Sequence, residues 1–268
     1  MKNINPDNGV VTQLFGGNAN PSYKGVGLRG HTGEDTDNGF GSVIHSPFDM
    51  YVYKVLTPAN PARDGSGFTG VFGIVDDGIE CFEYLIGHCN PTVSQGTHIA
   101  AGTQIGTEAN HGMVYEGGVQ ITLAMQQAGD KRGAHRHNQK RPVLKVRHTQ
   151  PGFTYLDLYS DSPAGSIFYD ANGFYYQAWN YGNGYNGCID PAKSVFQRDL
   201  AIGVSGYDVF VLQNILVREG CGNFEATGYF GNLTLAAMMK LQNKVGILPD
   251  AGYFGPKTRT LLQNKYNV

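Results

Sequence analysis

The sequence predicts a multidomain protein in which an N-terminal antiparallel all-β domain precedes a small C-terminal domain of three helices. Up to about residue 148, short apolar runs alternate with glycine turns, and the 38 glycines and 16 tyrosines of the chain suit turns and aromatic strands. From about residue 197 onward, apolar residues recur at helical spacing, and one motif is repeated. A chain of 268 residues is long enough for two hydrophobic cores.

The first domain is expected to span residues 1–148 and to consist of short strands. Residues 42–55, "SVIHSPFDMYVYKV", predict strand, turn and strand, and residues 70–88 predict two strands around a "DDG" turn. Residues 118–125, "GVQITLAM", and 141–146, "RPVLKV", predict two more strands. No long helix is expected in this domain.

The middle of the chain, residues 149–196, contains "FYDANGFYYQAWNYGNGYNG", which is rich in Tyr, Asn and Gly and poor in charge. This composition allows an ordered aromatic linker packed on its neighbours or a small β element, and it favours the linker.

The last domain is expected to span residues 197–268, with helices at 207–220, 232–246 and 256–267. The segment "TGYFGNLTLAAM" begins at Thr227, and the related "AGYFGPKTRTLL" begins 24 residues later at Ala251. Two helix–turn units that share one core explain this repeat.

Composition and charge exclude several kinds of partner. The net charge of −2 gives no reason to expect nucleic acid or an anionic membrane as a partner, and no apolar stretch is long enough to predict membrane insertion. The opening "MKNINPDNGVVTQLFGG" has no apolar run typical of a signal peptide, so we expect synthesis in the cytoplasm without one.

The four cysteines do not form a CxxC pair or the dense pattern of a disulfide scaffold, so reduced thiols are the default expectation. Two pairings stay open in an oxidising compartment, Cys81 with Cys89 and Cys188 with Cys221.

Histidines and one aspartate form the candidate site. His135 and His137 in "GAHRH" would share one face of a strand, as would His31 and Asp35 in "RGHTGEDTDNG", while His88 ends the apolar run "EYLIGH". Imidazole and carboxylate groups suit zinc, and a catalytic zinc site needs three protein ligands and one open position. The alternative is a set of solvated polar residues in turns and at strand ends.

These motifs, taken in order, resemble the zinc metallopeptidases of the lysostaphin/LytM type, family M23. The resemblance covers about residues 25–146 and includes "HTGEDTDNGFGSVIHSPFDMYVYKV" and "YLIGHCNPTVSQGTHIAAGTQIG". It implies one Zn²⁺ per chain, held by His31, Asp35 and His137. It also implies that His88 and His135 are catalytic and orient or deprotonate the attacking water and stabilise the oxyanion.

Some features have no place in this resemblance. Residues 107–133 make the segment between His88 and His135 longer than the family usually has, and within it His111 or Glu116 could contact substrate or metal. The remaining histidines are interpreted as surface or packing residues: His45, His98 and His148.

The C-terminal domain resembles the three-helix peptidoglycan-binding-like domain of cell-wall hydrolases, through "GYDVFVLQ" and the two "GYFG" turns. Tyr229 and Tyr253 are the candidate wall-binding residues, whereas Phe230 and Phe254 are expected to pack in the core. A helical dimerisation or packing domain is the alternative.

Together the two resemblances imply a zinc-dependent endopeptidase that cuts peptide cross-links or stem peptides of bacterial peptidoglycan. The expected setting is a phage lysin that acts on the cell wall during host lysis or from the virion. The alternative is a non-catalytic wall-binding or structural virion tail protein that retains the peptidase fold.

Overall fold

The computed structural model describes residues 4–17, 23, 30–147, 166–169, 174–178 and 187–268. Within these ranges the side chains are also described, except those of residues 144–147, 166–169 and 174–178. It divides the chain into two compact units. The β-unit comprises Asn3–Val75 and Cys81–Pro191, and the helical unit comprises Met1–Lys2, Asp76–Glu80 and Ala192–Val268. An antiparallel β region followed by a three-helix region confirms the predicted fold class, and the expected domain boundaries stay predictions.

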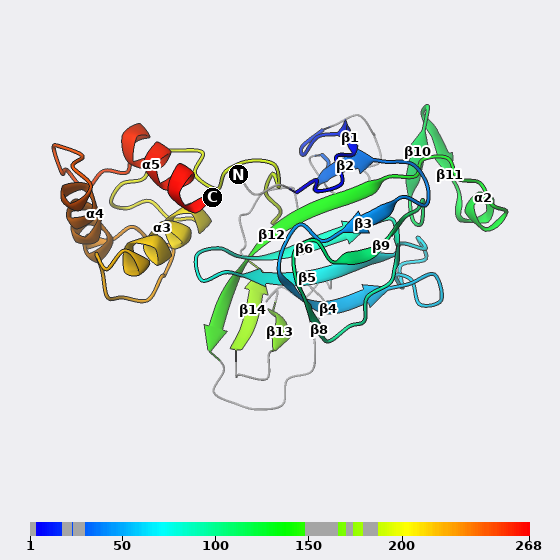
Figure 1. Ribbon diagram of the computed structural model, residues 1–268, viewed down its shortest axis with the longest axis horizontal. Coiled ribbons are helices and arrows are strands. Elements are labelled where there is room, and N and C mark those ends of the chain that lie inside the picture. Colours follow the sequence, from blue (N-terminus) through cyan, green and yellow to red (C-terminus); the bar gives the residue numbers. More distant parts are fainter. Residues whose placement is uncertain (1–3, 18–22, 24–29, 148–165, 170–173, 179–186) are drawn as a thin grey trace. The chain divides into compact units, whose positions relative to one another are not determined.

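The β-unit is built on one large antiparallel sheet (Figure 1), whose main path runs β1-β2-β12-β6-β5-β4-β8. The long strand β12 pairs with β2 on one side and with β6 on the other, and near its end it also pairs with β14. The bounds along the path are Val10–Gln13, Glu34–Asp37, Arg136–Arg147, Cys81–Gly87, Gly70–Asp76, Met50–Leu56 and Thr97–Ile99.

Two smaller sheets accompany the main one. In the first, β9 (Gln104–Glu108) pairs with both β3 (Val43–His45) and β7 (Cys89–Pro91). The second is the hairpin of β10 (Val114–Glu116) and β11 (Val119–Ile121).

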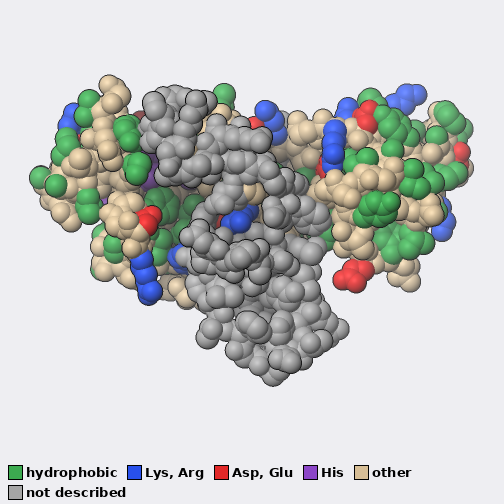
Figure 2. All heavy atoms as spheres, turned by 180° about the vertical axis from the view of Figure 1, so that it is seen from behind, with side chains coloured by type: hydrophobic (Ala, Val, Ile, Leu, Met, Phe, Trp, Pro, Cys, Tyr) green, Lys and Arg blue, Asp and Glu red, His purple; other side chains and the backbone are tan. Residues whose placement is uncertain are grey.

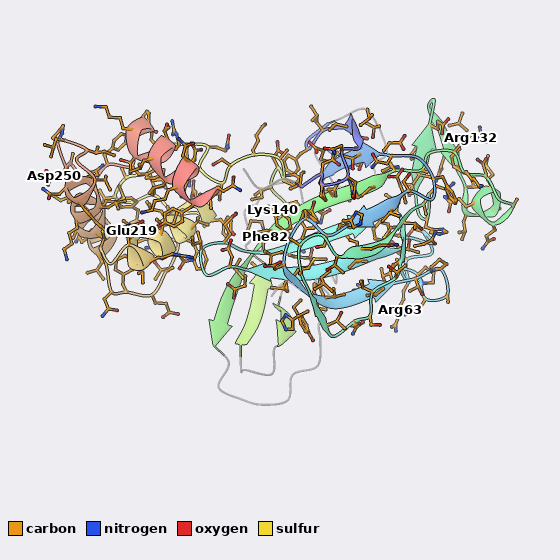
Figure 3. The ribbon with its side chains drawn as sticks, in the orientation of Figure 1. Arg63, Phe82, Arg132, Lys140, Glu219 and Asp250 are labelled. Carbon is orange, nitrogen blue, oxygen red and sulfur yellow. The ribbon has the colours of Figure 1, made fainter. Side chains whose placement is uncertain are left out.

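Both faces of the main sheet are covered at its centre. Strand β6 is buried along its whole length, and β5 is buried except at Asp76, which explains why both read as continuous apolar runs. On one face Phe48 contacts the rings of Phe82 and Tyr84 edge-on. Lys140 of β12 extends over the Phe82 ring of β6 at 4.3 Å from its centre (Figure 3).

The predicted strand at 118–125 is wrong in its second half. Strand β11 ends at Ile121, and Thr122 then caps the helix α2 (Leu123–Gln127) by accepting the Met125 N–H at 3.3 Å. The short apolar run did not distinguish strand from helix, whereas the threonine cap decides the local structure.

The described residues within 149–196 include two strands, β13 (Ser166–Tyr169) and β14 (Phe174–Ala178). Strand β14 extends the main sheet by pairing with the C-terminal half of β12, in register Val143 to Ala178. This stretch therefore contains a β element as well as residues that lie outside the described ranges.

The helical unit contains the three predicted helices, α3 (Tyr207–Arg218), α4 (Asn232–Lys244) and α5 (Pro256–Tyr266). The repeat has a physical basis, because one buried glutamine closes each "GYFG" turn. Gln213 accepts the Gly228 N–H at 2.8 Å and donates to the Tyr229 carbonyl at 2.9 Å. Gln242 does the same for Gly252 and Tyr253, at 2.8 and 2.7 Å.

Each of the two turns buries its phenylalanine and exposes its tyrosine. Phe230 and Phe254 are fully buried, whereas Tyr229 is 53% and Tyr253 is 44% exposed. Hydrophobic side chains also lie at the surface of the helical unit (Figure 2), and its most exposed aliphatic residues are Leu233, Leu248 and Ile202. The core role expected for the two phenylalanines is confirmed by this burial.

Two further expectations concern membranes and cysteines. Across the described ranges, no helix combines the length and apolar character needed to cross a membrane. All four cysteines are buried free thiols, and burial raises the pKa of Cys89 to about 12.

The glutamine in each turn gives a stability prediction. We expect Gln242→Leu to lower the free energy of unfolding of the helical unit by about 2–4 kcal/mol, because a buried N–H and a buried carbonyl lose their partners. Its exposed neighbour provides the matched control, and Asn243→Leu should change stability by less than about 0.5 kcal/mol. Urea unfolding followed by circular dichroism checks both, and equal effects would contradict the assigned role.

Candidate metal centre

Three adjacent strands carry the predicted site residues. In the register of the main sheet, His137 of β12 lies opposite Asp35 of β2 on one side and opposite Gly87 of β6 on the other. His88 follows Gly87 directly, and His31 precedes β2. The antiparallel pairing therefore brings together residues that are more than 100 positions apart in the chain.

Three donor atoms converge at this point. His31 Nε2 lies 2.9 Å from His137 Nδ1 and 3.1 Å from Asp35 Oδ1, and the last two atoms are 2.9 Å apart. All three residues are buried, and they form a group that could hold a metal ion. These separations are close to the roughly 3.3 Å that zinc bonds of about 2.0 Å impose at tetrahedral angles.

Hydrogen bonds behind the rings fix which nitrogen of each histidine faces the group. His31 Nδ1 is 3.3 Å from the Leu14 carbonyl, which can only accept, so this nitrogen carries the proton. His137 Nε2 is 3.3 Å from Gln139 Oε1, which also accepts the Thr32 hydroxyl at 2.7 Å. Such outer partners orient metal-binding histidines.

This choice of nitrogens determines the electrostatic interaction among the three donor atoms. When both rings are neutral, two unprotonated ring nitrogens and one carboxylate oxygen present their lone pairs to one another in a buried place. This arrangement is repulsive unless a cation lies among the lone pairs. The donor set therefore fits a divalent metal, and imidazole with carboxylate suits zinc.

A glycine allows the strands to approach one another here. A Cβ at Gly33 would lie 2.2 Å from the backbone oxygen of Asn138 on β12. The glycine between His31 and Asp35 is therefore a packing requirement of the site.

The two histidines predicted to be catalytic lie beside this group. Their ring centres are 4.5 Å apart, and His135 Nε2 is 3.6 Å from Asp35 Oδ2. His88 Nδ1 donates to the His111 carbonyl at 2.6 Å, and His135 Nδ1 donates to the Gly133 carbonyl at 2.8 Å. Both carbonyls can only accept, so Nδ1 of each ring carries a proton.

The charges of the site follow from its surroundings. Burial alone would raise the pKa of Asp35, but His135, His137 and His31 outweigh it and hold that pKa well below its usual value. Burial, together with His135 and His137, lowers the pKa of His88 well below its usual value. At neutral pH the centre therefore combines a carboxylate with a neutral His88.

Several contributors to the site were not predicted. Gln139 could have been found, because it lies two residues after His137 and a strand returns to the same face with period two. Tyr23 has its ring centre 5.9 Å from that of His31, and burial and the nearby Asp35 raise its pKa to about 12. Leu14 and Gly133 act through backbone carbonyls, for which the sequence carries no side-chain signal.

The unassigned polar residues have structural contacts. His111 Nε2 lies 2.8 Å from Asn90 Oδ1, and the Glu116 carboxylate accepts the Gly133 N–H at 2.6 Å. Neither belongs to the group that could hold a metal. His45 pairs with Asp7 at 2.6 Å, the exposed His98 lies against Tyr51, and His148 lies outside the described residues.

Comparison with known proteins bears on the two units differently. Residues 205–262 match the sequence model of the family described as putative peptidoglycan binding domain, which confirms the expected resemblance of the helical unit. No curated protein sequence matches the chain.

Among solved structures, LytU is similar at 21% identity, over 50% of this chain and 74% of LytU, with a TM-score of 0.36. The catalytic domain of lysostaphin from Staphylococcus simulans is similar at 16% identity, over 51% and 82% of the two chains, with a TM-score of 0.35. Csd3 from Helicobacter pylori is similar at 16% identity, over 50% of this chain and 27% of Csd3, with a TM-score of 0.31.

The converging donors give a binding prediction. We expect the chain to bind one Zn²⁺, and zinc at 100 times its Kd should raise the free energy of unfolding of the β-unit by about 2.7 kcal/mol. His31→Ala and His137→Ala should abolish both effects, while His98→Ala, at an exposed histidine, should retain them. Elemental analysis after dialysis and thermal melts with added zinc measure this, and full zinc occupancy in His137→Ala would refute the ligand assignment.

Proposed function

We propose that this protein is a zinc-dependent peptidoglycan endopeptidase that cuts peptide cross-links or stem peptides of the bacterial cell wall. The observation that carries the proposal is the convergence of donor atoms of His31, Asp35 and His137 beside two further histidines, His88 and His135. The sequence motifs that resemble family M23 place these five residues in the same order.

Hydrolysis of a peptide bond needs an attacking water, a place for its proton and stabilisation of the tetrahedral oxyanion. The bound zinc would supply Lewis acidity toward the scissile carbonyl and the attacking water. His88, whose pKa is lowered by burial, and His135 lie beside it, each held by a hydrogen bond at Nδ1. Either ring can take the proton of the water, and once protonated it can donate to the oxyanion or to the leaving amine.

The helical unit would bring the enzyme to its polymer. The match of residues 205–262 to a putative peptidoglycan binding domain supports bacterial peptidoglycan as the partner. A wall-binding unit on the same chain raises the effective concentration of substrate at the catalytic site. A phage lysin that acts during host lysis or from the virion is the setting we propose for this pair of units.

Activity is tested by the release of free amino groups from purified peptidoglycan. We expect release with zinc supplied and none after chelation, because the three ligands would then hold no ion. His88→Ala and His135→Ala should lower the rate by at least about 100-fold, the usual contribution of general acid–base groups, and should retain zinc. His98→Ala serves as the control for loss of a histidine away from the site.

The outcomes separate the two functional classes. Zinc-dependent release with new amino termini establishes the endopeptidase. No release from walls of several cross-link types, with wall binding intact, would replace the proposal with a non-catalytic wall-binding or virion tail protein.

Wall binding is tested separately at the exposed tyrosines. We expect Tyr229→Ala and Tyr253→Ala each to weaken sedimentation with intact peptidoglycan by about 3- to 10-fold, since each removes an exposed aromatic surface. Leu248→Ala, which truncates an apolar residue that is more exposed than either tyrosine, is the control. Tyr229 is expected to contribute more, because the Tyr253 hydroxyl already bonds Asp199. Unchanged binding in the double tyrosine variant would exclude both residues from the wall contact.

A further inference from the structure

Residues 109–133, the part of the 107–133 segment that we call the insertion, contact the backbones and rings of His88 and His135. The insertion begins at Ala109, whose N–H donates to the His88 carbonyl at 2.9 Å. The Ala109 carbonyl in turn accepts the His135 N–H at 3.3 Å. One residue therefore bridges the backbones of both histidines before the insertion folds into β10, β11 and α2.

The two ends of the insertion also supply the carbonyls that hold the imidazole rings. The His111 carbonyl near its start accepts from His88 Nδ1, and the Gly133 carbonyl at its end accepts from His135 Nδ1. The backbone approaches the His88 ring closely at Gly112. A Cβ at Gly112, where φ is +108°, would lie 3.2 Å from His88 Nδ1, and Gly133 also has a positive φ, of +68°.

Two side-chain amides hold these ends in place, and each donates hydrogen bonds to two backbone carbonyls. Gln126 Nε2 donates to the Gly112 carbonyl at 2.8 Å and to the Ile121 carbonyl at 3.0 Å. This joins α2 to the backbone that immediately follows the His111 carbonyl. Among the described residues Gln126 Oε1 is buried without a partner, so the glutamine is oriented by its donors alone.

The other amide acts at the opposite end. Asn110 is 2% exposed, and its Nδ2 donates to the Asp130 carbonyl at 2.7 Å and to the Arg132 carbonyl at 3.0 Å. These residues lead directly into Gly133, whose N–H is also held by Glu116. Arg132 lies beside the β10–β11 hairpin (Figure 3).

We propose that the insertion is the orienting scaffold of the histidine pair, with Gln126 as the positioning residue for His88 and Asn110 as the positioning residue for His135. The proposal rests on the proposed function, because it assigns the insertion a role in proton transfer at that site. Each amide fixes the carbonyl that keeps the proton on Nδ1 of its own histidine. The Nε2 lone pair of that histidine is thereby kept available to the reacting groups.

The experiment compares full-length variants that lose the donors but keep the size of the side chain. Gln126→Met and Asn110→Leu should bind one zinc with unchanged KM for peptidoglycan, while kcat falls about 10- to 100-fold, the usual effect of removing an outer hydrogen-bond partner. Gln127→Met is the matched control, since Gln127 is the exposed neighbour of Gln126 on α2, and it should match the wild type.

Nitrogen-15 NMR of the histidine rings supplies a readout that is independent of turnover. With His88 and His135 signals assigned from their alanine variants, the wild type should show the proton on Nδ1 of both rings. Gln126→Met should shift His88 toward the other tautomer and leave His135 unchanged, and Asn110→Leu should do the reverse.

The outcomes decide the proposal. Wild-type kcat and wild-type tautomers in Gln126→Met would overturn it, and this variant carries the test if Asn110→Leu fails to fold. A parallel loss of zinc or a raised KM would also overturn it, because the insertion would then support the metal or the substrate. If the wild type releases no amino groups from any wall, the proposed function fails, and the NMR comparison still decides whether the insertion orients the rings.

Discussion

The site depends on the register of β12 between β2 and β6. His137 lies opposite Asp35 on one side and opposite Gly87 on the other, so this single alignment places a ligand pair and delivers His88. A slip of one residue would turn His137 to the opposite face of the sheet and present Arg136 or Asn138 in its place. The close approach at Gly33, where no Cβ fits against the Asn138 carbonyl, reinforces this alignment.

Residues on the opposite face of β12 hold the strand in place and do not belong to the candidate metal group. Arg136 is buried, and it donates to Asp7 at 2.6 Å, to Asn5 at 2.7 Å and to Thr36 at 3.1 Å. Asn138 donates to the same threonine hydroxyl at 3.1 Å. A buried guanidinium and a buried amide are tolerable only when paired in this way, and the pairing fixes both neighbours of His137. Alternation along one strand thus separates a structural polar network from the candidate site.

Much of the architecture and most of the site could be predicted from the sequence. Alternation, glycine turns and the "GYFG" repeat indicated the strands and the three helices, and the period of two placed His31 with Asp35 and His135 with His137. Prediction from the sequence failed at Thr122, where a polar helix cap interrupts an apolar run. It also failed where a backbone carbonyl, and not a side chain, accepts the hydrogen bond from a histidine ring. The carbonyls of Leu14, His111 and Gly133 fix three imidazole rings, but any residue type carries such a carbonyl.

The backbone at His88, where β6 ends, has a strained conformation that orients the imidazole ring. His88 has φ of +56°, a left-handed conformation that a residue with a Cβ adopts at an energetic penalty. Its N–H donates to the Thr69 carbonyl at 3.0 Å and its carbonyl accepts from Ala109 at 2.9 Å, so the surrounding backbone holds the conformation. The left-handed turn lets β6 end and β7 begin at the next residue, and it leaves the imidazole beside His135. Because His88 is not among the three converging donors, the proposed metal binding alone gives no reason for this strain, whereas the proposed catalytic role of its ring does.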